Sequence, residues 1–422
     1  MSAPESFKAV ILVGGAQKGT RFRPLSLQLP KPLFPVAGVP LIDHHISQLC
    51  QLKSLSSIYL IGFYPADQFE EFLEDCNRKY NIPIRYLQEK ESQGTAGGLL
   101  KFKNDLREGH PTGIFVLNAD ICGDLPISEM VDELRAQGPK AHCLILTTEA
   151  TRDQSTNFGS VVIDSKDAQN PKGKVLHYVD KPTTFVSTHI SCGIYLLRTS
   201  AFWPQLEKLK NGNGGQFWLE TDMFPQMAAN DTLYAVHTCR WWSQTKTAAA
   251  ALYANRHYLR LYKERCPERL AQSDVAEIVG EVFIDPTATV HPTAKIGPNV
   301  SIGANAIVAA GVRVRESIIL QECVLEEHCC VLHSIVGWNS VIGQWARVEG
   351  TPIAPNPNIP FAKLDNKPLF NSDGRLNPSL TILGAGVHVP RETVILNSVV
   401  LPNKDLRRDK DLSSSYKNQI IL

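Results

Sequence analysis

The sequence predicts an α/β domain with a mostly parallel sheet, followed by a parallel β-helix. From residue 7 to about residue 240, strand-like apolar runs alternate with helical stretches, as is typical of α/β folds. From residue 284 onward, aliphatic residues recur at every sixth position, the pattern of hexapeptide repeats. A length of 422 residues is too great for one ordinary core and suits two domains.

Composition excludes several classes of protein. The net charge of +1 gives no electrostatic basis for binding nucleic acid or a membrane surface. No uninterrupted apolar run approaches the length of a membrane span, and the N-terminal residues lack the pattern of a signal peptide. The 10 cysteines are scattered without a small-domain disulfide framework, so we expect a reduced, cytoplasmic setting.

The apolar runs of the N-terminal half are predicted to form buried strands. The clearest of them are at residues 9–13, 57–62, 113–118 and 142–147. Ligands of such sheets bind beyond the carboxyl ends of the strands. The glycine-rich segment that follows residues 9–13 is therefore a candidate ligand loop.

The boundaries follow from changes in pattern. We expect the α/β domain to span residues 1–243 and a helical connector, rich in alanine, to span 244–277. The repeat domain then covers 278–422, with a proline-rich insertion at 351–380. Such an insertion is either a passive solvated excursion or a contact for a partner, and we favour the partner contact.

The repeats predict which side chains face the inside of the β-helix. The competing interpretation, ordinary half-buried strands, does not explain so regular a spacing. The predicted inward positions form two registers: Ile284, Val290, Ile296, Ile302, Val308 and Val314, then Ile318, Val324, Cys330, Val336, Ile342 and Val348.

A cluster of histidine and cysteine within the repeats could suggest a zinc site. Its members are His328, Cys329, Cys330 and His333. They lie inside the hexad register, with Cys330 at a predicted inward position. We therefore favour a buried thiol and surface imidazoles over a metal site.

The segment after the first strand has the composition of a phosphate-binding loop. Glycine lets backbone N–H groups approach an anion closely, and such groups ahead of a helix form an anion nest. Nearby hydroxyl and basic side chains add donors and positive charge. The residues concerned are Gly14, Gly15, Gly19, Thr20, Arg21 and Lys31.

Residues 14–26 and the Pro-Lys-Pro of residues 30–32 resemble the signature of sugar-nucleotide pyrophosphorylases. These enzymes join a nucleoside triphosphate to a sugar 1-phosphate and release pyrophosphate. The resemblance implies a Rossmann-like nucleotidyltransferase domain, a left-handed β-helix, and catalytic roles for Arg21 and Lys31. Three residues, 16–18, stand where the signature has one. Because phosphoryl-type transfer depends on positioning, this widened loop argues against catalysis.

Within that family, the chain most resembles GDP-mannose pyrophosphorylase, also called mannose-1-phosphate guanylyltransferase. Residues 331–338 and 342–349 carry this likeness. The widened loop and the proline-rich insertion resemble its regulatory α branch. That resemblance implies self-association and assembly with a catalytic β subunit, with GDP-mannose or GTP as ligand.

The resemblance also assigns ligand contacts residue by residue. It implies nucleotide binding by Gly14, Gly15, Gly19, Thr20, Gln88, Gly94, Thr95, Asn118 and Asp120. It implies sugar binding by Gly159, Asp180, Lys181, Cys192 and Glu220. Ser191 replaces the asparagine that is usual in the family, which makes hexose recognition a weaker expectation.

The expected metal site is altered. The resemblance makes Asp120 the first of two aspartates that hold Mg²⁺, and Ser243 stands where the second should be. A neutral hydroxyl is a poor ligand for a hard cation, so we expect weakened Mg²⁺ binding. Nucleotide contacts are thus mostly retained while metal-assisted transfer is compromised.

Three functions remain open from the sequence. The leading one is a regulatory subunit that binds GDP-mannose in a degenerate active site and feedback-inhibits the catalytic β subunit, in GDP-mannose synthesis for glycosylation. The alternative is an active guanylyltransferase that makes GDP-mannose and pyrophosphate from GTP and mannose 1-phosphate. The third is a structural subunit whose β-helix scaffolds oligomers.

Overall fold

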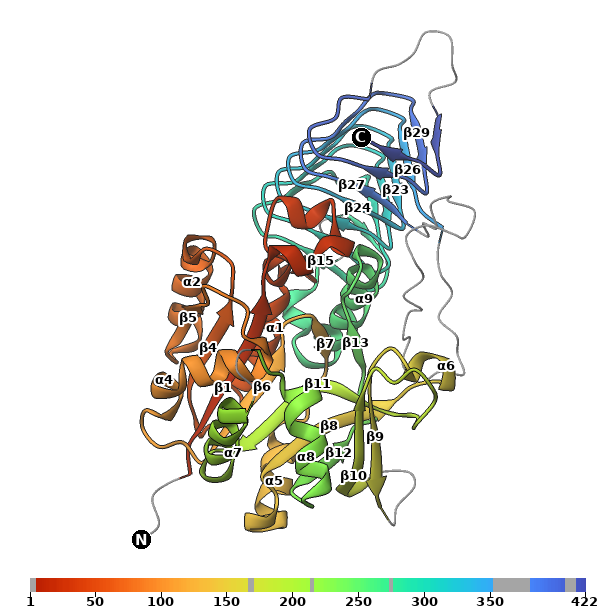
Figure 1. Ribbon diagram of the computed structural model, residues 1–422. Coiled ribbons are helices and arrows are strands. Elements are labelled where there is room, and N and C mark those ends of the chain that lie inside the picture. The colour runs from red at the N-terminus through yellow and green to blue at the C-terminus, as the bar shows by residue number, and fades with distance from the viewer. Residues whose placement is uncertain (1–4, 166–170, 213–215, 273–275, 352–379, 407–414) are drawn as a thin grey trace. The chain divides into compact units, whose positions relative to one another are not determined.

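The computed structural model describes residues 5–165, 171–212, 216–272, 276–351, 380–406 and 415–422 (Figure 1). The described chain forms two compact units. The first contains residues 5–18 and 42–243, and the second contains residues 19–41 and those from 244 onward. The segment 19–41 therefore belongs with the C-terminal unit despite its place in the sequence. The interior of the insertion expected at 351–380 lies outside the described residues.

The described part of the first unit is built on a nine-stranded sheet, which Figure 1 shows with helices on its faces. In spatial order its strands are β5 (Ile84–Gln88), β4 (Leu55–Gly62), β1 (Phe7–Gly14), β6 (Gly113–Asn118), β11 (His189–Arg198), β8 (Cys143–Glu149), β12 (Leu233–His237), β10 (Lys172–Asp180) and β9 (Gly159–Asp164). A smaller sheet pairs β7 (Ile121–Gly123) with β13 (Trp242–Gln244).

The sheet is mixed rather than mostly parallel, which corrects the sequence-based expectation. β5, β4, β1 and β6 are parallel to one another, and β8 is parallel to β12. β11 is antiparallel to both β6 and β8, and β10 is antiparallel to β9 and β12. The connection between β9 and β10 is too short for the crossover that parallel neighbours require.

Helices cover the sheet and complete its core. They are α1 (Leu41–Leu49), α2 (Glu70–Tyr80), α3 (Gly94–Lys101), α4 (Lys103–Arg107), α5 (Ile127–Gln137), α6 (Arg152–Ser155), α7 (Thr199–Gly212) and α8 (Phe224–Ala229). Tyr195 and Val116 of the sheet pack in one cluster with Phe202 and Phe224 of the helices, all at most 2% exposed. Across the described residues, no helix combines the length and apolar character that crossing a bilayer requires.

In the second unit, α9 (Ala248–Arg265) supplies the predicted helix. It begins after Thr247, whose hydroxyl accepts a hydrogen bond from Ala250 N at 3.4 Å, and it ends before Pro267. Its fully buried Asn255 accepts hydrogen bonds from Ala37 N at 2.7 Å and Ser301 Oγ at 2.8 Å. This amide therefore joins the segment 19–41 to the β-helix.

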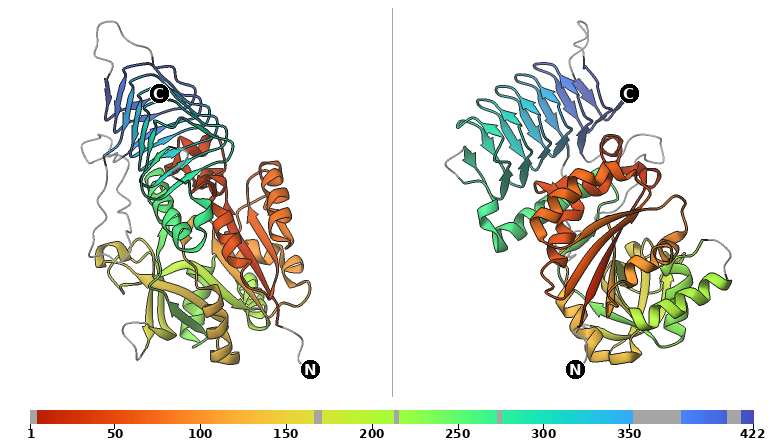
Figure 2. Two further views of the ribbon diagram at one scale, coloured as in Figure 1. Left: turned by 180° about the vertical axis from the view of Figure 1, so that it is seen from behind. Right: turned by 90° about the vertical axis from the view of Figure 1, so that its left-hand side faces the viewer.

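The repeats form a parallel β-helix of three sheets, whose stacked coils are visible in Figure 2. One sheet contains β14 (Glu277–Ile278), β17 (Lys295–Ile296), β20 (Arg313–Arg315), β23 (Cys330–Leu332), β26 (Arg347–Glu349), β29 (Val394–Leu396) and β31 (Ser415–Lys417). The second contains β15 (Val282–Ile284), β18 (Val300–Ile302), β21 (Ile318–Ile319), β24 (Ser334–Val336), β27 (Thr381–Leu383), β30 (Val399–Val400) and β32 (Ile420–Ile421). The third contains β16 (Thr289–Val290), β19 (Ile307–Val308), β22 (Val324–Leu325), β25 (Val341–Ile342) and β28 (His388–Val389).

The structure corrects three predicted inward positions. The partner of Ile302 in the next coil is Ile319, one residue beyond the predicted Ile318. In the same way, Val308 pairs with Leu325 instead of Val324. Val314 pairs with Val331 instead of Cys330. The corner that follows Val314 is one residue shorter than its predecessors, and side-chain direction alternates along a strand, so this step changes which residue faces inward.

The shifted register puts Val331, and not Cys330, inside the β-helix, and the two neighbouring cysteines differ in burial. Cys329 is fully buried and its burial raises the thiol pKa to about 12, whereas Cys330 is half-buried. The prediction of an inward Cys330 was wrong by one residue. His328 adopts φ +60° and stacks on Trp345, with ring centroids 4.4 Å apart.

Candidate functional site

The glycine loop follows β1 at the carboxyl edge of the sheet. Gly14 adopts φ +68°, a conformation that favours glycine, and its carbonyl accepts a hydrogen bond from Phe63 N at 2.7 Å. A Cβ at Gly15 would lie 2.9 Å from the Phe63 Cβ, so this turn packs closely on the end of β4. Gly14 and Gly15 are thus held by the neighbouring parallel strand.

The rest of the predicted loop belongs to the second unit and contains no α-helix. After Gly19 come short 3-10 helices at Thr20–Phe22, Leu25–Leu27 and Lys31–Leu33. Prolines at 24, 30 and 32 prevent a longer helix, so the expected nest ahead of a helix is replaced by a chain of tight turns.

These turns are anchored through aromatic contacts within the second unit. Phe22 is buried and meets Phe34 edge to face at 5.1 Å between ring centroids. Lys31 Nζ lies 5.8 Å from the Phe22 ring centre, whereas Thr20 and Arg21 are exposed. The two basic residues of the signature therefore differ, because Lys31 is fixed over a ring and Arg21 extends into solvent.

At the end of β6, Asn118 and Asp120 lie at the carboxyl edge of the sheet. Gly193 adopts φ +72° beside the Asn118 amide. Asp120 is half-buried, and its negative charge acts on His45, whose Nε2 lies 2.8 Å from the Ile121 carbonyl oxygen. Burial is the larger effect and lowers the His45 pKa to about 4. His45 is therefore neutral at neutral pH.

Ser243 lies on β13, which pairs with β7, the strand directly after Asp120. Asp124 N donates to the Trp241 carbonyl at 2.9 Å, and Trp242 Nε1 donates to the Cys192 carbonyl at 3.0 Å. Ser243 itself is buried. The strand that carries the expected second ligand is thus in place, while the side chain is a neutral hydroxyl.

That donor set does not fit a site with two carboxylates for Mg²⁺. The nearby Asp124 and Glu129 are both paired with Arg240. One carboxylate, Asp120, and one hydroxyl, Ser243, are the oxygen groups offered by the two expected positions. The two expected positions therefore lack the second anionic ligand of such a metal site.

Two predicted ligand residues meet directly. Thr95 Oγ1 donates to Glu220 Oε2 at 2.6 Å and accepts from Leu219 N at 2.9 Å. Gly94, which begins α3, adopts φ +80°, and a Cβ there would overlap the Phe217 carbonyl oxygen. Gly94 is therefore required for α3 to reach the segment that carries Glu220.

Tyr195 is a member of this cluster that sequence reasoning missed. Its hydroxyl donates to Glu220 Oε1 at 3.3 Å from within the buried strand β11. Burial raises the pKa of the Glu220 carboxyl, and the hydrogen bonds from Thr95 and Tyr195 oppose that rise. A tyrosine between the apolar Ile194 and Leu196 was the available signal, because a buried phenol hydroxyl usually has a polar partner.

The remaining predicted contacts lie near the ends of strands. Asp180 pairs with Gly159 across β10 and β9, and a Cβ at Gly159 would overlap the Tyr178 hydroxyl. Lys181 adopts φ +44°, and its Nζ lies 3.1 Å from Asp180 Oδ2. Cys192 on β11 is fully buried.

On the opposite flank, Gln88 ends β5 and is exposed. Glu89 follows it, and the Glu89 backbone N–H donates a hydrogen bond to the Gly62 carbonyl at 2.7 Å. The structure thus joins Thr95 to Glu220 and Gly159 to Asp180 and Lys181, and sets Asn118 beside Gly193.

Comparison with known proteins places this chain in a family. Residues 8–260 match the model of the nucleotidyl transferase family, and residues 278–421 match the model described as the GMPPB C-terminal domain. The regulatory subunit alpha of mannose-1-phosphate guanylyltransferase from Drosophila melanogaster is 51% identical to this chain, and that from Homo sapiens is 50% identical. Each match covers 98% of this chain and 100% of the relative.

This chain belongs to the family of mannose-1-phosphate guanylyltransferase regulatory subunits alpha. A further member, alpha-A of Danio rerio, is 49% identical over the same share of both chains. The family predicted from residues 14–26 is confirmed. In this chain, Thr95 is hydrogen-bonded to Glu220, and a serine stands at position 243.

Proposed function

We infer that this chain is a regulatory subunit that binds GDP-mannose at the candidate site and inhibits a catalytic β subunit of mannose-1-phosphate guanylyltransferase. The relatives are regulatory alpha subunits by name, which supports the regulatory role. The observation that carries the proposal is Ser243, a neutral hydroxyl on the strand beside Asp120. A site that keeps its ligand-contacting residues but lacks a metal-binding carboxylate suits binding better than transfer.

Binding of the nucleotide sugar is supported by the joined contacts. Asn118 and Thr95 offer hydrogen-bonding groups at strand and helix ends, where the sheet leaves room for a ligand. Asp180 and Lys181 stand as a charged pair on the expected sugar side, and the Lys181 ammonium can exchange its carboxylate partner for a phosphate. These groups supply binding without a metal ion.

Thermal unfolding with and without GDP-mannose tests the binding. A ligand that binds only the folded state must raise the unfolding temperature. We expect this rise in the wild type and its loss in Thr95→Val, which removes the bridge to Glu220. The exposed Thr183→Val provides a matched control that should keep the rise. An unfolding temperature unaffected by GDP-mannose would contradict the proposal and favour a scaffold role.

An active guanylyltransferase is the second candidate, because Arg21, Lys31 and Asp120 are all present. The purified chain, free of β subunit, is incubated with GTP, mannose 1-phosphate and Mg²⁺, and pyrophosphate release is measured. We expect no turnover. Robust turnover that is lost in Asp120→Asn would make this chain an enzyme.

Assembly and cellular context belong to the same proposal. We propose a complex with the catalytic β subunit together with self-association, in the cytoplasm, where GDP-mannose is made for glycosylation. The cysteines among the described residues are not joined by disulfides, which suits a reducing compartment. The interior of the insertion at 351–380, which we expect to contact a partner, lies outside the described residues.

A further inference from the structure

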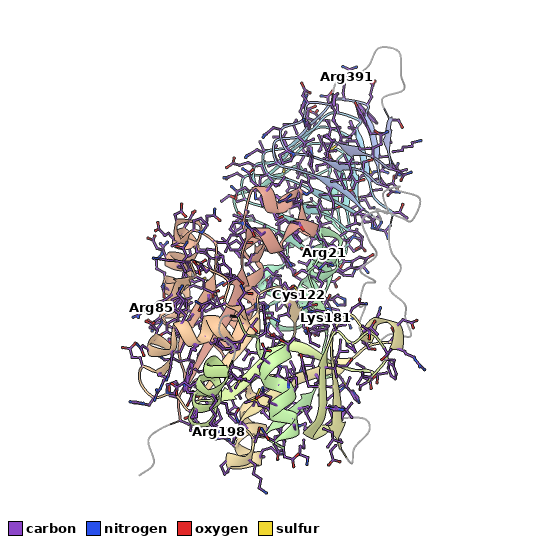
Figure 3. The ribbon with its side chains drawn as sticks, viewed as in Figure 1. Arg21, Arg85, Cys122, Lys181, Arg198 and Arg391 are labelled. Atoms are coloured by element: carbon purple, nitrogen blue, oxygen red, sulfur yellow. The ribbon has the colours of Figure 1, made fainter. Side chains whose placement is uncertain are left out.

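A separate cavity of about 380 Å³ lies in the first unit, at the amino end of β6. Its walls come from the segment before β6, which includes Arg107 and His110, and from the junction of β11 with α7, which includes Arg198 and Ser200. β6 is six residues long, so with a rise of about 3.3 Å per residue the cavity lies roughly 17 Å from Asn118. In Figure 3, Arg198 lies at the end of this unit away from Cys122 and Lys181.

The described residues that line this cavity carry positive charge and no carboxylate. Arg107, His110 and Arg198 all contribute to its walls. The Arg198 guanidinium is fixed by three neutral acceptors, the carbonyls of residues 134, 138 and 141, at 2.7, 2.8 and 3.0 Å. Its charge is therefore held in place, and none of these three described partners is an anion.

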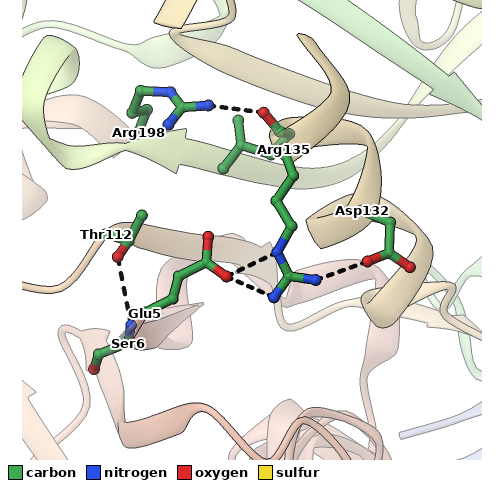
Figure 4. Close-up of polar contacts among 7 residues, drawn as sticks. Glu5, Ser6, Thr112, Asp132, Arg135 and Arg198 are labelled. Atoms are coloured by element: carbon green, nitrogen blue, oxygen red, sulfur yellow. Dashed lines mark hydrogen bonds and ion pairs between the residues drawn. The ribbon is translucent and has the colours of Figure 1, made fainter. Parts of the chain in front are cut away.

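A nearby carboxylate is already engaged elsewhere. Glu5 acts electrostatically on Arg198, but its Oε2 accepts hydrogen bonds from Arg135 Nε at 2.8 Å and Nη2 at 2.5 Å. Asp132 accepts from the same arginine at 2.8 Å (Figure 4). Glu5 is thus shared with Arg135 and is not among the residues that line the cavity.

The amino end of α7 adds further donors. The first N–H groups of a helix have no acceptor within it, and the helix dipole makes this end positive. Thr199, the first residue of α7, donates its N–H to the Thr112 carbonyl at 3.2 Å and its hydroxyl to the Pro111 and Thr112 carbonyls, so the donors that this turn can offer begin at Ser200. Ser200, in the same first turn, is exposed and lines the cavity.

An unpaired buried donor lies beside the same cavity. Trp203 is 4% exposed and lines it, and its indole Nε1 has no acceptor among the described residues. That nitrogen is itself sealed from solvent, so it lies behind the cavity surface and is not one of the groups that face the cavity. The groups that carry the site are the two arginines, His110 and the first turn of α7.

We propose that this cavity binds the phosphate group of a small phosphorylated metabolite. Phosphate offers several acceptor oxygens and a negative charge, which match the two guanidinium groups and the first turn of α7. The volume exceeds that of a phosphate ion alone and lies in the range of small-molecule sites. This site is independent of the candidate site at the carboxyl ends of the strands.

The test is calorimetric titration of the full chain with inorganic phosphate at constant ionic strength. We expect a binding isotherm that Arg107→Gln weakens about ten-fold, the usual effect of removing one charge-assisted hydrogen bond. Ser200→Asp should abolish it, because a carboxylate then occupies the first turn of α7. An acidic residue at that position favours the helix, so this variant should remain folded.

Two control variants separate this site from the glycine loop. Arg85→Gln removes an exposed arginine on β5, and Arg21→Gln removes the exposed arginine of the loop. Both should bind phosphate at the cavity as the wild type does. Glycerol 3-phosphate should bind at least as tightly as inorganic phosphate, since the cavity has room for an organic group.

Three results would overturn the proposal. They are no measurable phosphate binding, equal affinity in wild type and Ser200→Asp, or loss of binding in Arg21→Gln with retention in Arg107→Gln. If glycerol 3-phosphate binds more weakly than inorganic phosphate, the ligand is not an organic phosphate, and that part of the proposal is wrong. Because Arg107 and Ser200 line the cavity and lie outside the candidate site, failure of their variants to change phosphate binding leaves the proposed regulatory function standing.

Discussion

Single residues decide how the candidate site is held together. Thr95 bridges Glu220 and the backbone of Leu219, so one hydroxyl fixes two chain segments that are more than a hundred residues apart in sequence. Gly94 makes that approach possible, because its φ of +80° and its lack of a Cβ let α3 reach the Phe217 carbonyl. Glycine and threonine here act as a unit that positions Glu220.

Replacement of Gly94 by alanine should therefore be costly. We expect Gly94→Ala to lower the free energy of unfolding by more than about 2 kcal/mol, since backbone strain and a steric overlap add. Gly109→Ala is the matched control, because Gly109 has φ +73° but open space around it. Gly109→Ala should lower the free energy of unfolding by about 1 kcal/mol, from backbone strain alone. If urea unfolding shows the same loss of unfolding free energy in both variants, the close approach at Gly94 is not formed.

The Glu220 carboxyl should leave a signature in the pH dependence of stability. Burial raises its pKa above the usual 4.5, so the folded chain holds this proton more tightly than the unfolded chain does. The resulting stability is complete below pH 4.5 and is lost as pH rises through the folded-state pKa.

The variant Glu220→Gln carries no such proton. Its free energy of unfolding should therefore rise relative to that of the wild type as pH increases through this window. Urea unfolding of both proteins over a pH series measures the difference. A difference that is constant with pH, or that falls, would show that Glu220 is not held in a pKa-raising environment.

At the scale of elements, the sequence predicts periodic structure well. The β-helix follows from the spacing of aliphatic residues, and α9 follows from its alanine run. Residues 113–118 were expected to form a buried strand, and β6 has those bounds. Each of these signals is local, because a strand or helix repeats its side-chain direction within a few residues.

The features that the sequence did not reveal depend on non-local geometry. A corner shortened by one residue after Val314 moves the inward face from Cys330 to Val331, and spacing alone cannot tell a shorter corner from an unbroken series. The antiparallel insertion of β11 between β6 and β8 depends on which strands meet in space. Tyr195 joined the site through that same insertion.

The corrected register gives a direct test at the element scale. Val331 is fully buried inside the β-helix, whereas Val324 is half-buried. We expect Val331→Ala to lower the unfolding free energy by about 2 kcal/mol through the cavity it leaves. Val324→Ala should cost less than about 1 kcal/mol. The reverse order in denaturant unfolding would restore the register predicted from the spacing of six.

Considered as a whole molecule, the chain divides the predicted phosphate loop between its two compact units. Gly14 and Gly15 belong to the first unit, while Thr20, Arg21 and Lys31 belong to the second. A sequence signature shows that such residues are close along the chain, but it does not show which core each part joins. Asn255 of α9 binds Ala37 N, and this contact helps to attach the segment 19–41 to the second unit.

At the scale of the whole molecule, we propose that this chain senses GDP-mannose for a catalytic partner. The deciding measurement is the rate of pyrophosphate release by the catalytic β subunit, with rising GDP-mannose, in the presence and absence of this chain. We predict that the chain makes the β subunit more sensitive to GDP-mannose, and that Thr95→Val in this chain removes the added sensitivity while Thr183→Val keeps it. If GDP-mannose affects the β subunit equally with and without this chain, the regulatory account is wrong.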